Sequence, residues 1–247
     1  MAEKYYYDLH IHSCLSPCGD DDMTPNNIAG MAALKGLSVV ALCDHNTLKN
    51  CPAFYKACKK QGLVAIAGTE VTTSEDIHMI CLFKSLDKAM EFDLFLEKHR
   101  IHIKNNEDVF GTQLIMNEND EIIGREEDLL INATDLDVES LKELVPIYDG
   151  VVYPAHIDRD SNGIVSILGT LPENPEFSSY EFHLSEKVDE YKSRFSILKD
   201  KPIVISSDAH FLWDINEAEN SFELSLEKYS SDAVREAVFG YLLGENV

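Results

Sequence analysis

Short apolar segments recur along this chain, and most of them end in a histidine or a carboxylate and lead into a helix-like stretch. The segments 38–42, 63–67, 150–154 and 203–206 are continuously apolar or nearly so, which is typical of strands buried on both faces of a parallel sheet. Polar groups at the carboxyl ends of such strands form the active-site face of an α/β barrel. The pattern therefore predicts an α/β barrel with a polar site at one end.

The polar residues at the segment ends are of the types that bind transition metals. His10 and His12 lie two residues apart at the end of the first segment, so in a strand both rings point to one face and reach one metal ion. The same residue types recur at the later segments, as His45, Glu70, His78, His156, Asp208 and His210. Imidazole and carboxylate together favour Mn²⁺, Fe²⁺ or Zn²⁺ over Ca²⁺, which prefers oxygen ligands.

Helix boundaries are visible between the apolar segments. Thr24 is a good N-cap, Pro25 suits the first helical position, and Gly36 can end that helix. The other predicted helices cover about 52–60, 85–98, 138–145, 186–199 and 231–240.

Residues 103–149 interrupt the strand-and-helix pattern. Segments 113–116 and 121–123 predict a hairpin with a polar loop. We expect this stretch to be an insertion over the active-site face. It would act as a substrate lid, with Arg125 or Lys104 available for a second anionic group, or alternatively as a packing or dimer element.

The ordered motifs resemble those of the PHP (polymerase and histidinol phosphatase) family of metal-dependent phosphoesterases. The matching pieces are DLHIHS at 8–13, CDHN at 43–46, GTEV at 68–71, IHMICLF at 77–83, PAHIDR at 154–159 and SSDAH at 206–210. No single piece is specific, but the set follows the family's order. The resemblance implies a distorted (β/α)7 TIM-like barrel in a single domain, residues 1–247, that binds two or three divalent metal ions (Mn, Fe or Zn).

The resemblance also implies a role for each candidate ligand. His10, His12 and Asp208 look like ligands of a first metal, His45 and His210 of a second, His78 and His156 of a third, and Glu70 looks like a bridging carboxylate.

One further ligand is expected in the loop after the first strand. Asp20 lies four residues before the Thr-Pro pair that opens the next helix, as in one branch of the family, and Asp21 or Asp22 are alternatives. Cys14 and Cys18 flank this loop. One of these thiols can touch a metal, but we expect small buried side chains instead.

Two aspartates adjoin candidate ligands. Asp44 precedes His45 and Asp8 precedes His10 by two residues, so each is expected to orient a ligand imidazole. The alternatives are a solvated aspartate and a residue that caps a helix or turn.

The implied activity is that of a hydrolase acting on phosphate ester bonds through a metal-bridging hydroxide. Glu70 would hold the bridge, and Asp208 or His210 would assist proton transfer. The ligand loop and the sequence near Glu70 favour a small phosphorylated substrate, a nucleotide or short oligonucleotide. The alternatives are a histidinol-phosphate-type phosphatase, a metal-dependent amidohydrolase and a catalytically silent metal-binding scaffold.

Arg159 is the candidate substrate-binding residue. A similarly spaced arginine follows the matching histidine in family members that cleave nucleotides, and its planar fork suits bidentate phosphate binding. The alternative is a surface arginine paired with Asp158 or Asp160.

Charge and composition restrict the partners. The formal net charge is −23, with 44 acidic against 21 basic residues, which argues against a general nucleic-acid-binding surface and a stable nucleic-acid complex. No apolar stretch reaches transmembrane length and no signal-peptide pattern is present, so we expect no membrane partner and a cytoplasmic protein with reduced thiols. The sequence does not indicate an oligomeric state.

Overall fold

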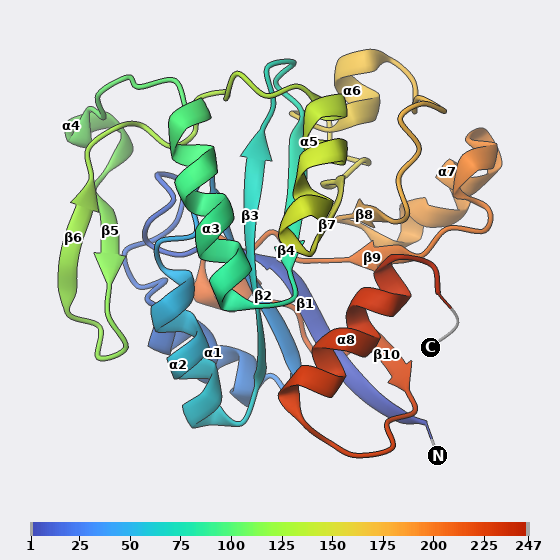
Figure 1. Cartoon of the computed structure of the whole chain (residues 1–247), viewed down its shortest axis with the longest axis horizontal. Coiled ribbons are helices and arrows are strands. Elements are labelled where there is room, and N and C mark those ends of the chain that lie inside the picture. Colours follow the sequence, from blue (N-terminus) through green and yellow to red (C-terminus); the bar gives the residue numbers. More distant parts are fainter. Residues whose placement is uncertain (1, 246–247) are drawn as a thin grey trace.

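A curled six-stranded sheet forms the centre of the computed structural model, which describes residues 2–245 (Figure 1). Its strand order is β10-β1-β2-β3-β4-β7. The strands are β1 (Glu3–Ile11), β2 (Val39–His45), β3 (Val64–Thr72), β4 (His78–Phe83), β7 (Gly150–Pro154) and β10 (Ser221–Leu224). The predicted apolar segments 38–42, 63–67, 77–83 and 150–154 thus form neighbouring strands of this sheet, whereas the segment 203–206 lies outside it.

Strand direction explains how the polar ends meet. β1, β2 and β3 are parallel as predicted, whereas β4 is antiparallel to β3 and to β7. The turn at 73–77 is too short for the crossover that a parallel neighbour requires. Because β4 is reversed, His78 at its amino end lies at the same edge of the sheet as the carboxyl ends of β1 to β3.

A separate parallel pair, β8 (Tyr180–Phe182) and β9 (Ile203–Ile205), joins the two sides of the curl. On one side the Ile157 N–H donates to the carbonyl oxygen of Glu181 over 2.9 Å. On the other, the His12 N–H donates to the carbonyl oxygen of Ala209 over 3.0 Å. The predicted α/β barrel is confirmed as a curled, half-barrel α/β fold, in which the main sheet has six strands.

Eight helices occur among the described residues: α1 (Pro25–Leu34), α2 (Cys51–Gln61), α3 (Leu86–Leu96), α4 (Glu107–Phe110), α5 (Val138–Leu144), α6 (Ile164–Leu168), α7 (Val188–Arg194) and α8 (Ser231–Leu242). The Thr24 side chain accepts from Asn27 N–H, as predicted for the cap of α1. The single helix predicted over 186–199 is wrong. Short 3-10 turns flank α7, because the backbone is extended at Phe195, whose ring packs into the core. None of the helices in residues 2–245 is long and apolar enough to cross a membrane.

Both faces of the sheet are buried. Val40 and Leu42 of β2 belong to a core shared with α1, α2 and α3, whereas Val39 and Ala41 belong to a second core shared with β9 and α8. Complete burial of such a side chain contributes about 1.5–3 kcal/mol. This packing accounts for the continuously apolar strands and fixes the end of the sheet on which the polar residues collect.

The segment 103–149 contains the predicted hairpin, formed by β5 (Gln113–Met116) and β6 (Ile122–Glu126), which lies at the flank of the molecule in Figure 1. The hairpin packs beside the loop after β1, where the Leu114 N–H donates to the carbonyl oxygen of Cys14. Arg125 and Lys104 are exposed and pair with Glu107 and Glu127 of the same segment.

Candidate metal centre

Side chains from all the predicted segments surround a cavity of about 140 Å³ at the polar end of the sheet. Its lining is Cys18, His45, Glu70, His78, Ile131, His156, Arg159, Ser161, Asn162, Asp208 and His210. His10 and His12 lie directly behind it, fully buried. Ile131 is the residue of the 103–149 segment that lines this cavity. All the predicted ligands except Asp20 therefore converge on one site.

Glu70 of β3 is the centre of the cluster and is 1% exposed. Its Oε2 faces three imidazole nitrogens, those of His45 at 3.1 Å, His12 at 3.4 Å and His10 at 3.6 Å. Its Oε1 faces two more, those of His78 at 2.7 Å and His156 at 3.0 Å. The two oxygens of one carboxylate thus face separate sets of histidines, which is the arrangement that a bridging ligand needs.

Three groups of side chains have ligand atoms that all lie within 4.8 Å of one another. The groups are His10, His12, Glu70 and Asp208; His45, Glu70 and His78; and His12, Cys18, His45 and His210. In the first group, Asp208 Oδ1 is 3.0 Å from His12 Nε2 and 3.4 Å from His10 Nε2. Each group combines nitrogen with oxygen or sulfur donors, as transition-metal sites do.

Hydrogen bonds fix which nitrogen of each imidazole faces the cluster. A carboxylate only accepts, so the Nδ1–H of His10 donates to Glu181 Oε1 over 2.9 Å. Ser16 donates its hydroxyl proton to Asp44 over 2.7 Å, so the His12 Nδ1–H donates to Ser16 Oγ over 3.1 Å. In the uncharged form of either ring, these bonds hold the proton on Nδ1 and leave Nε2 free to face the cluster, the tautomer that a metal requires.

Asp44 and Asp8 accept hydrogen bonds from backbone N–H groups around the site. Each was expected to orient a ligand imidazole, but neither carboxylate is hydrogen-bonded to an imidazole. Asp44 accepts 2.7 Å hydrogen bonds from the backbone and hydroxyl of Ser13 and from Ser16, so its effect on His12 passes through Ser16. Asp8 accepts from the backbone N–H of Ser207, which ties β1 to the loop that carries Asp208. Burial raises the pKa of Asp8 to about 6, against the opposing effect of these hydrogen bonds.

Several buried ligand atoms in the described part of the chain lack a hydrogen-bond partner. They include His45 Nδ1, His78 Nδ1 and Asp208 Oδ1. An unsatisfied buried polar group costs about 1–3 kcal/mol. These atoms instead face other ligand atoms at short range, and a divalent ion between them would satisfy all of them. The donor set therefore fits a metal cluster.

The cluster strongly favours positive charge. Burial raises the pKa of Glu70, but His78, His10 and His45 lower it further, so that it lies well below its usual range. Burial lowers the pKa of His12, but Asp208 and Glu70 reverse this and raise it to about 9. Without a metal the carboxylates favour the protonated forms of His10 and His12, and divalent ions would displace those protons.

Two site residues have a strained backbone. His156 has φ of 25° and Asp208 has φ of 52°, in a region that costs a non-glycine residue about 1–3 kcal/mol. At His156 the strained peptide is held because its N–H donates to Glu181 Oε1 over 3.1 Å.

Glu181 is a site residue that the sequence analysis missed. It is 1% exposed on β8 and binds both the His10 ring and the His156 backbone. The sequence feature that points to it is a single acidic residue between two aromatic residues in the segment 180–182.

Asp20 is the predicted ligand that the structure does not bring to the cluster. Its carboxylate accepts from the Asp22 N–H, and its own N–H donates to the carbonyl oxygen of His210. Asp21 and Asp22 are exposed. Cys18 is the member of this loop whose side chain lies among the ligand groups.

Arg159 adjoins the cluster, where its guanidinium donates to Asp208 Oδ2 rather than pairing with Asp158 or Asp160. It also lines a second, larger cavity of about 540 Å³, together with His183 and Phe211. The arginine thus lies between the metal cluster and a space large enough for a substrate.

Comparison with known proteins agrees with this geometry. The model of the PHP domain matches residues 8–144. A 5'-3' exoribonuclease of Haemophilus influenzae is 35% identical over 85 residues, 33% of this chain and 29% of that protein. An uncharacterised protein of Methanocaldococcus jannaschii is 33% identical over 100 residues, 37% of this chain and 58% of that protein. The chain therefore matches less than two thirds of the length of either relative.

A solved structure extends the comparison to the whole fold. The lesion-specific endonuclease of Pyrococcus furiosus superposes with a TM-score of 0.69 at 21% identity, over 98% of this chain and 56% of that chain.

Fold and site together define an α/β protein with a candidate metal centre of histidines and carboxylates. More specifically, the chain belongs to the PHP family, as its ordered motifs predicted.

Proposed function

We propose that this protein hydrolyses a phosphate ester of a nucleotide or a short, unpaired oligonucleotide. The observation that carries the proposal is the position of Arg159, which lies between the metal cluster and the larger cavity and contacts Asp208. A guanidinium at this point can hold a phosphate by two parallel hydrogen bonds while the scissile bond faces the cluster.

The proposed centre holds two or three divalent ions, Mn²⁺, Fe²⁺ or Zn²⁺. In this proposal Glu70 bridges, His10, His12 and Asp208 form one site, His45 and His210 a second, and His78 and His156 a third. Ions bound there would lower the pKa of a water nucleophile to about 7 and neutralise charge on the phosphoryl oxygens.

The chain's own groups orient the reactants. Arg159 positions the phosphate, and Glu181 and Ser16 keep the imidazoles of His10 and His12 in the required tautomer. Burial and the neighbouring His12 lower the pKa of His210 to about 4, so at neutral pH this imidazole is uncharged. Asp208 or His210 is placed to accept or return a proton at the mouth of the cavity.

A pair of stacked aromatic rings supports a nucleobase-containing substrate. Phe211 lines the larger cavity, and its ring centroid lies 5.2 Å from that of Trp213, with 13° between the planes. Trp213 is 69% exposed. Stacking of an unpaired base on such a surface contributes about 1–3 kcal/mol and needs no particular sequence.

Charge and relatives limit the substrate further. With a formal net charge of −23, the protein is poorly suited to follow a long phosphate backbone, which favours a short substrate held by the metals and Arg159. The names of the similar exoribonuclease and endonuclease place nucleic acid among the substrates to be tested.

We further infer that the whole chain, 1–247, forms one domain, in which β8 and β9 complete a distorted (β/α)7 barrel and the 103–149 segment borders the active-site face. Ile131 in the cavity wall supports that position. Residue 1 and residues 246–247 of this domain lie outside the described residues.

The test combines metal content with activity. Metals per chain are counted in protein purified without chelator. Phosphate or nucleotide release is then assayed with 3',5'-bisphosphonucleotides, short single-stranded RNA and DNA, abasic DNA and histidinol phosphate. Turnover of a nucleotide substrate that is lost in Arg159→Ala, with the metal count unchanged, supports the proposal. Turnover of histidinol phosphate alone would indicate the phosphatase branch, and bound metal with no hydrolysis would indicate a silent scaffold.

A further inference from the structure

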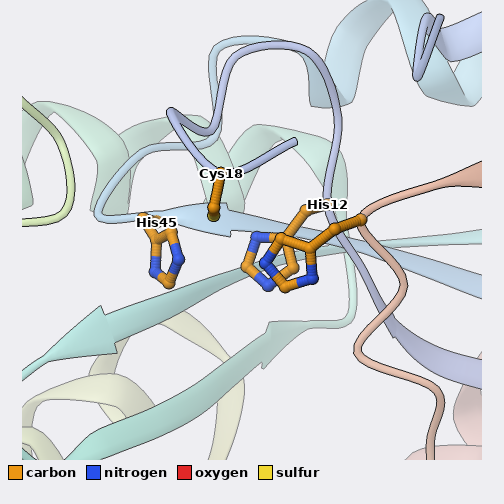
Figure 2. Close-up of side chains that lie close together, drawn as sticks. His12, Cys18 and His45 are labelled. Carbon is orange, nitrogen blue, oxygen red and sulfur yellow. The ribbon is translucent and has the colours of Figure 1, made fainter. Parts of the chain in front are cut away.

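The side chain of Cys18, in the loop after β1, lies close to the imidazoles of His12, His45 and His210 (Figure 2). The ligand atoms of Cys18, His12, His45 and His210 all lie within 4.8 Å of one another. Figure 2 shows the Cys18 side chain pointing down between His45 and His12. Cys18 also lines both cavities, so its sulfur lies where the metal cluster meets the substrate space.

The loop is built to place this side chain. The Gly19 N–H donates to the carbonyl oxygen of Ser16 over 2.9 Å, which closes a turn around Pro17 and Cys18. A side chain at position 19 would collide with the carbonyl oxygen of Ser13, so the turn requires glycine. The next residue, Asp20, is fixed by the 2.9 Å hydrogen bond from its N–H to the His210 carbonyl oxygen. These contacts direct Cys18, and not Asp20, toward the imidazoles.

The imidazoles of His45 and His210, which face Cys18, have nitrogen atoms available to bind a metal ion. His45 is 3% exposed, and its Nδ1 is buried without a hydrogen-bond partner. The Nδ1–H of His210 donates to the carbonyl oxygen of Asp208 over 2.7 Å, which leaves its Nε2 unprotonated. Nitrogen atoms of His45 and His210 and the sulfur of Cys18 therefore lie close enough to share one ion. Nitrogen with sulfur suits Zn²⁺, Fe²⁺ or Co²⁺ better than Mn²⁺ or Mg²⁺.

We propose that Cys18 is a thiolate ligand of the metal ion held by His45 and His210, in place of the aspartate expected from this loop. On binding, the thiol loses its proton to solvent and the sulfur donates an electron pair to the metal. The inference rests on the metal centre of the proposed function, but not on its substrate. A thiolate makes this metal position softer than one with only oxygen and nitrogen ligands, and it therefore favours metals that bind sulfur.

Cobalt substitution gives a readout that does not depend on activity. The metal-free protein is titrated with Co²⁺, and the sulfur-to-cobalt charge-transfer absorption is followed in the near ultraviolet. We expect this band in the unaltered protein and in Asp20→Asn, and its loss in Cys18→Ser. Cys14→Ala is the matched control, because Cys14 is buried against the carbonyl oxygen of Leu114 and lies outside the ligand groups. It should keep the band.

Three results would overturn the inference: bound cobalt without the band, a band that survives Cys18→Ser, or a band that Cys14→Ala removes. If no cobalt binds at all, the proposed metal centre itself fails. Cys18→Asp provides a second check, since a carboxylate there should restore cobalt binding without the band. In competition dialysis, we expect Cys18→Asp to shift the Zn²⁺-to-Mn²⁺ preference toward Mn²⁺ by at least about tenfold. An unchanged preference would also contradict the thiolate ligand.

Discussion

Glu181 Oε1 lies 2.9 Å from the Nδ1 of His10 and also accepts, over 3.1 Å, the backbone N–H of His156. One buried carboxylate thus fixes the tautomer of an imidazole on β1 and the strained backbone of a histidine after β7. Since the two histidines face different oxygens of Glu70, Glu181 aligns both sides of the proposed metal cluster.

Glu181→Gln tests this alignment. The amide oxygen can still accept from His10, but the negative charge that favours the metal-ready imidazole is lost. We expect metal affinity to fall by about 10–100-fold, as for other partners that orient a ligand. Calorimetric titration with Zn²⁺ measures the change. Glu223→Gln, an exposed acid on β10, is the control and should leave the affinity unaltered.

Metal removal should destabilise the folded protein, because the ligands come from strands far apart in the sequence and several of their atoms are otherwise unsatisfied. A metal present at a hundred times its dissociation constant contributes about 2.7 kcal/mol. For a domain of this size that corresponds to a fall in Tm of about 5–10 °C on chelation. The shift should shrink in His78→Ala and persist in His99→Ala, whose ring pairs with Asp135 at the surface. Equal Tm values with and without chelator would contradict a structural metal cluster.

Arg159→Lys keeps the charge of the proposed phosphate-binding residue but loses its planar fork. A hydrogen bond to a charged group contributes about 1.5–3 kcal/mol, so kcat/KM should fall by about 10–150-fold while the number of bound metals stays constant. Arg125→Lys is the matched control, because Arg125 is exposed and faces Glu107 at 3.8 Å. A comparable loss in that control would mean that the 103–149 segment, and not Arg159 alone, binds the substrate.

Stability should depend on pH through Glu126, which is half-buried between Lys49 at 2.6 Å and Arg100 at 3.3 Å. Burial raises the pKa of Glu126, but the two cations outweigh it and lower the pKa below its usual range. A depressed pKa means that the folded state binds its proton less tightly than the unfolded state does. The stabilisation is therefore complete above the ordinary glutamate pKa and is lost as pH falls through the lowered value.

Glu126→Gln should accordingly lower the free energy of unfolding at neutral pH by about 1–2 kcal/mol, allowing for the partly exposed lysine. The difference from the unaltered protein should shrink as the pH falls below the glutamate range. Urea unfolding at several pH values measures it. Glu127→Gln removes an exposed pair with Lys104 and should change stability little at any pH.

The sequence predicts a site residue well when the residue's position within its own strand places it in the site, and poorly when contacts with remote parts of the chain place it there. The His10 and His12 pair and Glu70 lie at or near the carboxyl ends of apolar segments, and a parallel sheet that buries those segments brings them to one edge. His78 begins its segment and reaches the same edge only because β4 is reversed. Cys18 could not be chosen over Asp20, because that choice depends on a turn closed at Gly19 and on a contact with His210. Glu181 was missed because its partners lie on strands remote in the sequence.

Trp213→Ala tests whether the larger cavity accepts a base. Loss of the exposed ring beside Phe211 removes a stacking surface that contributes about 1–3 kcal/mol per base. The KM for a nucleotide substrate should therefore rise by about 5- to 150-fold, with kcat little changed, because the ring lies outside the metal cavity. A sugar phosphate without a base should show no such rise, and Tyr229→Ala, which is exposed at a different cavity, is the control. Equal effects on both substrates would assign Trp213 to the folding of the loop after β9 instead of to base recognition.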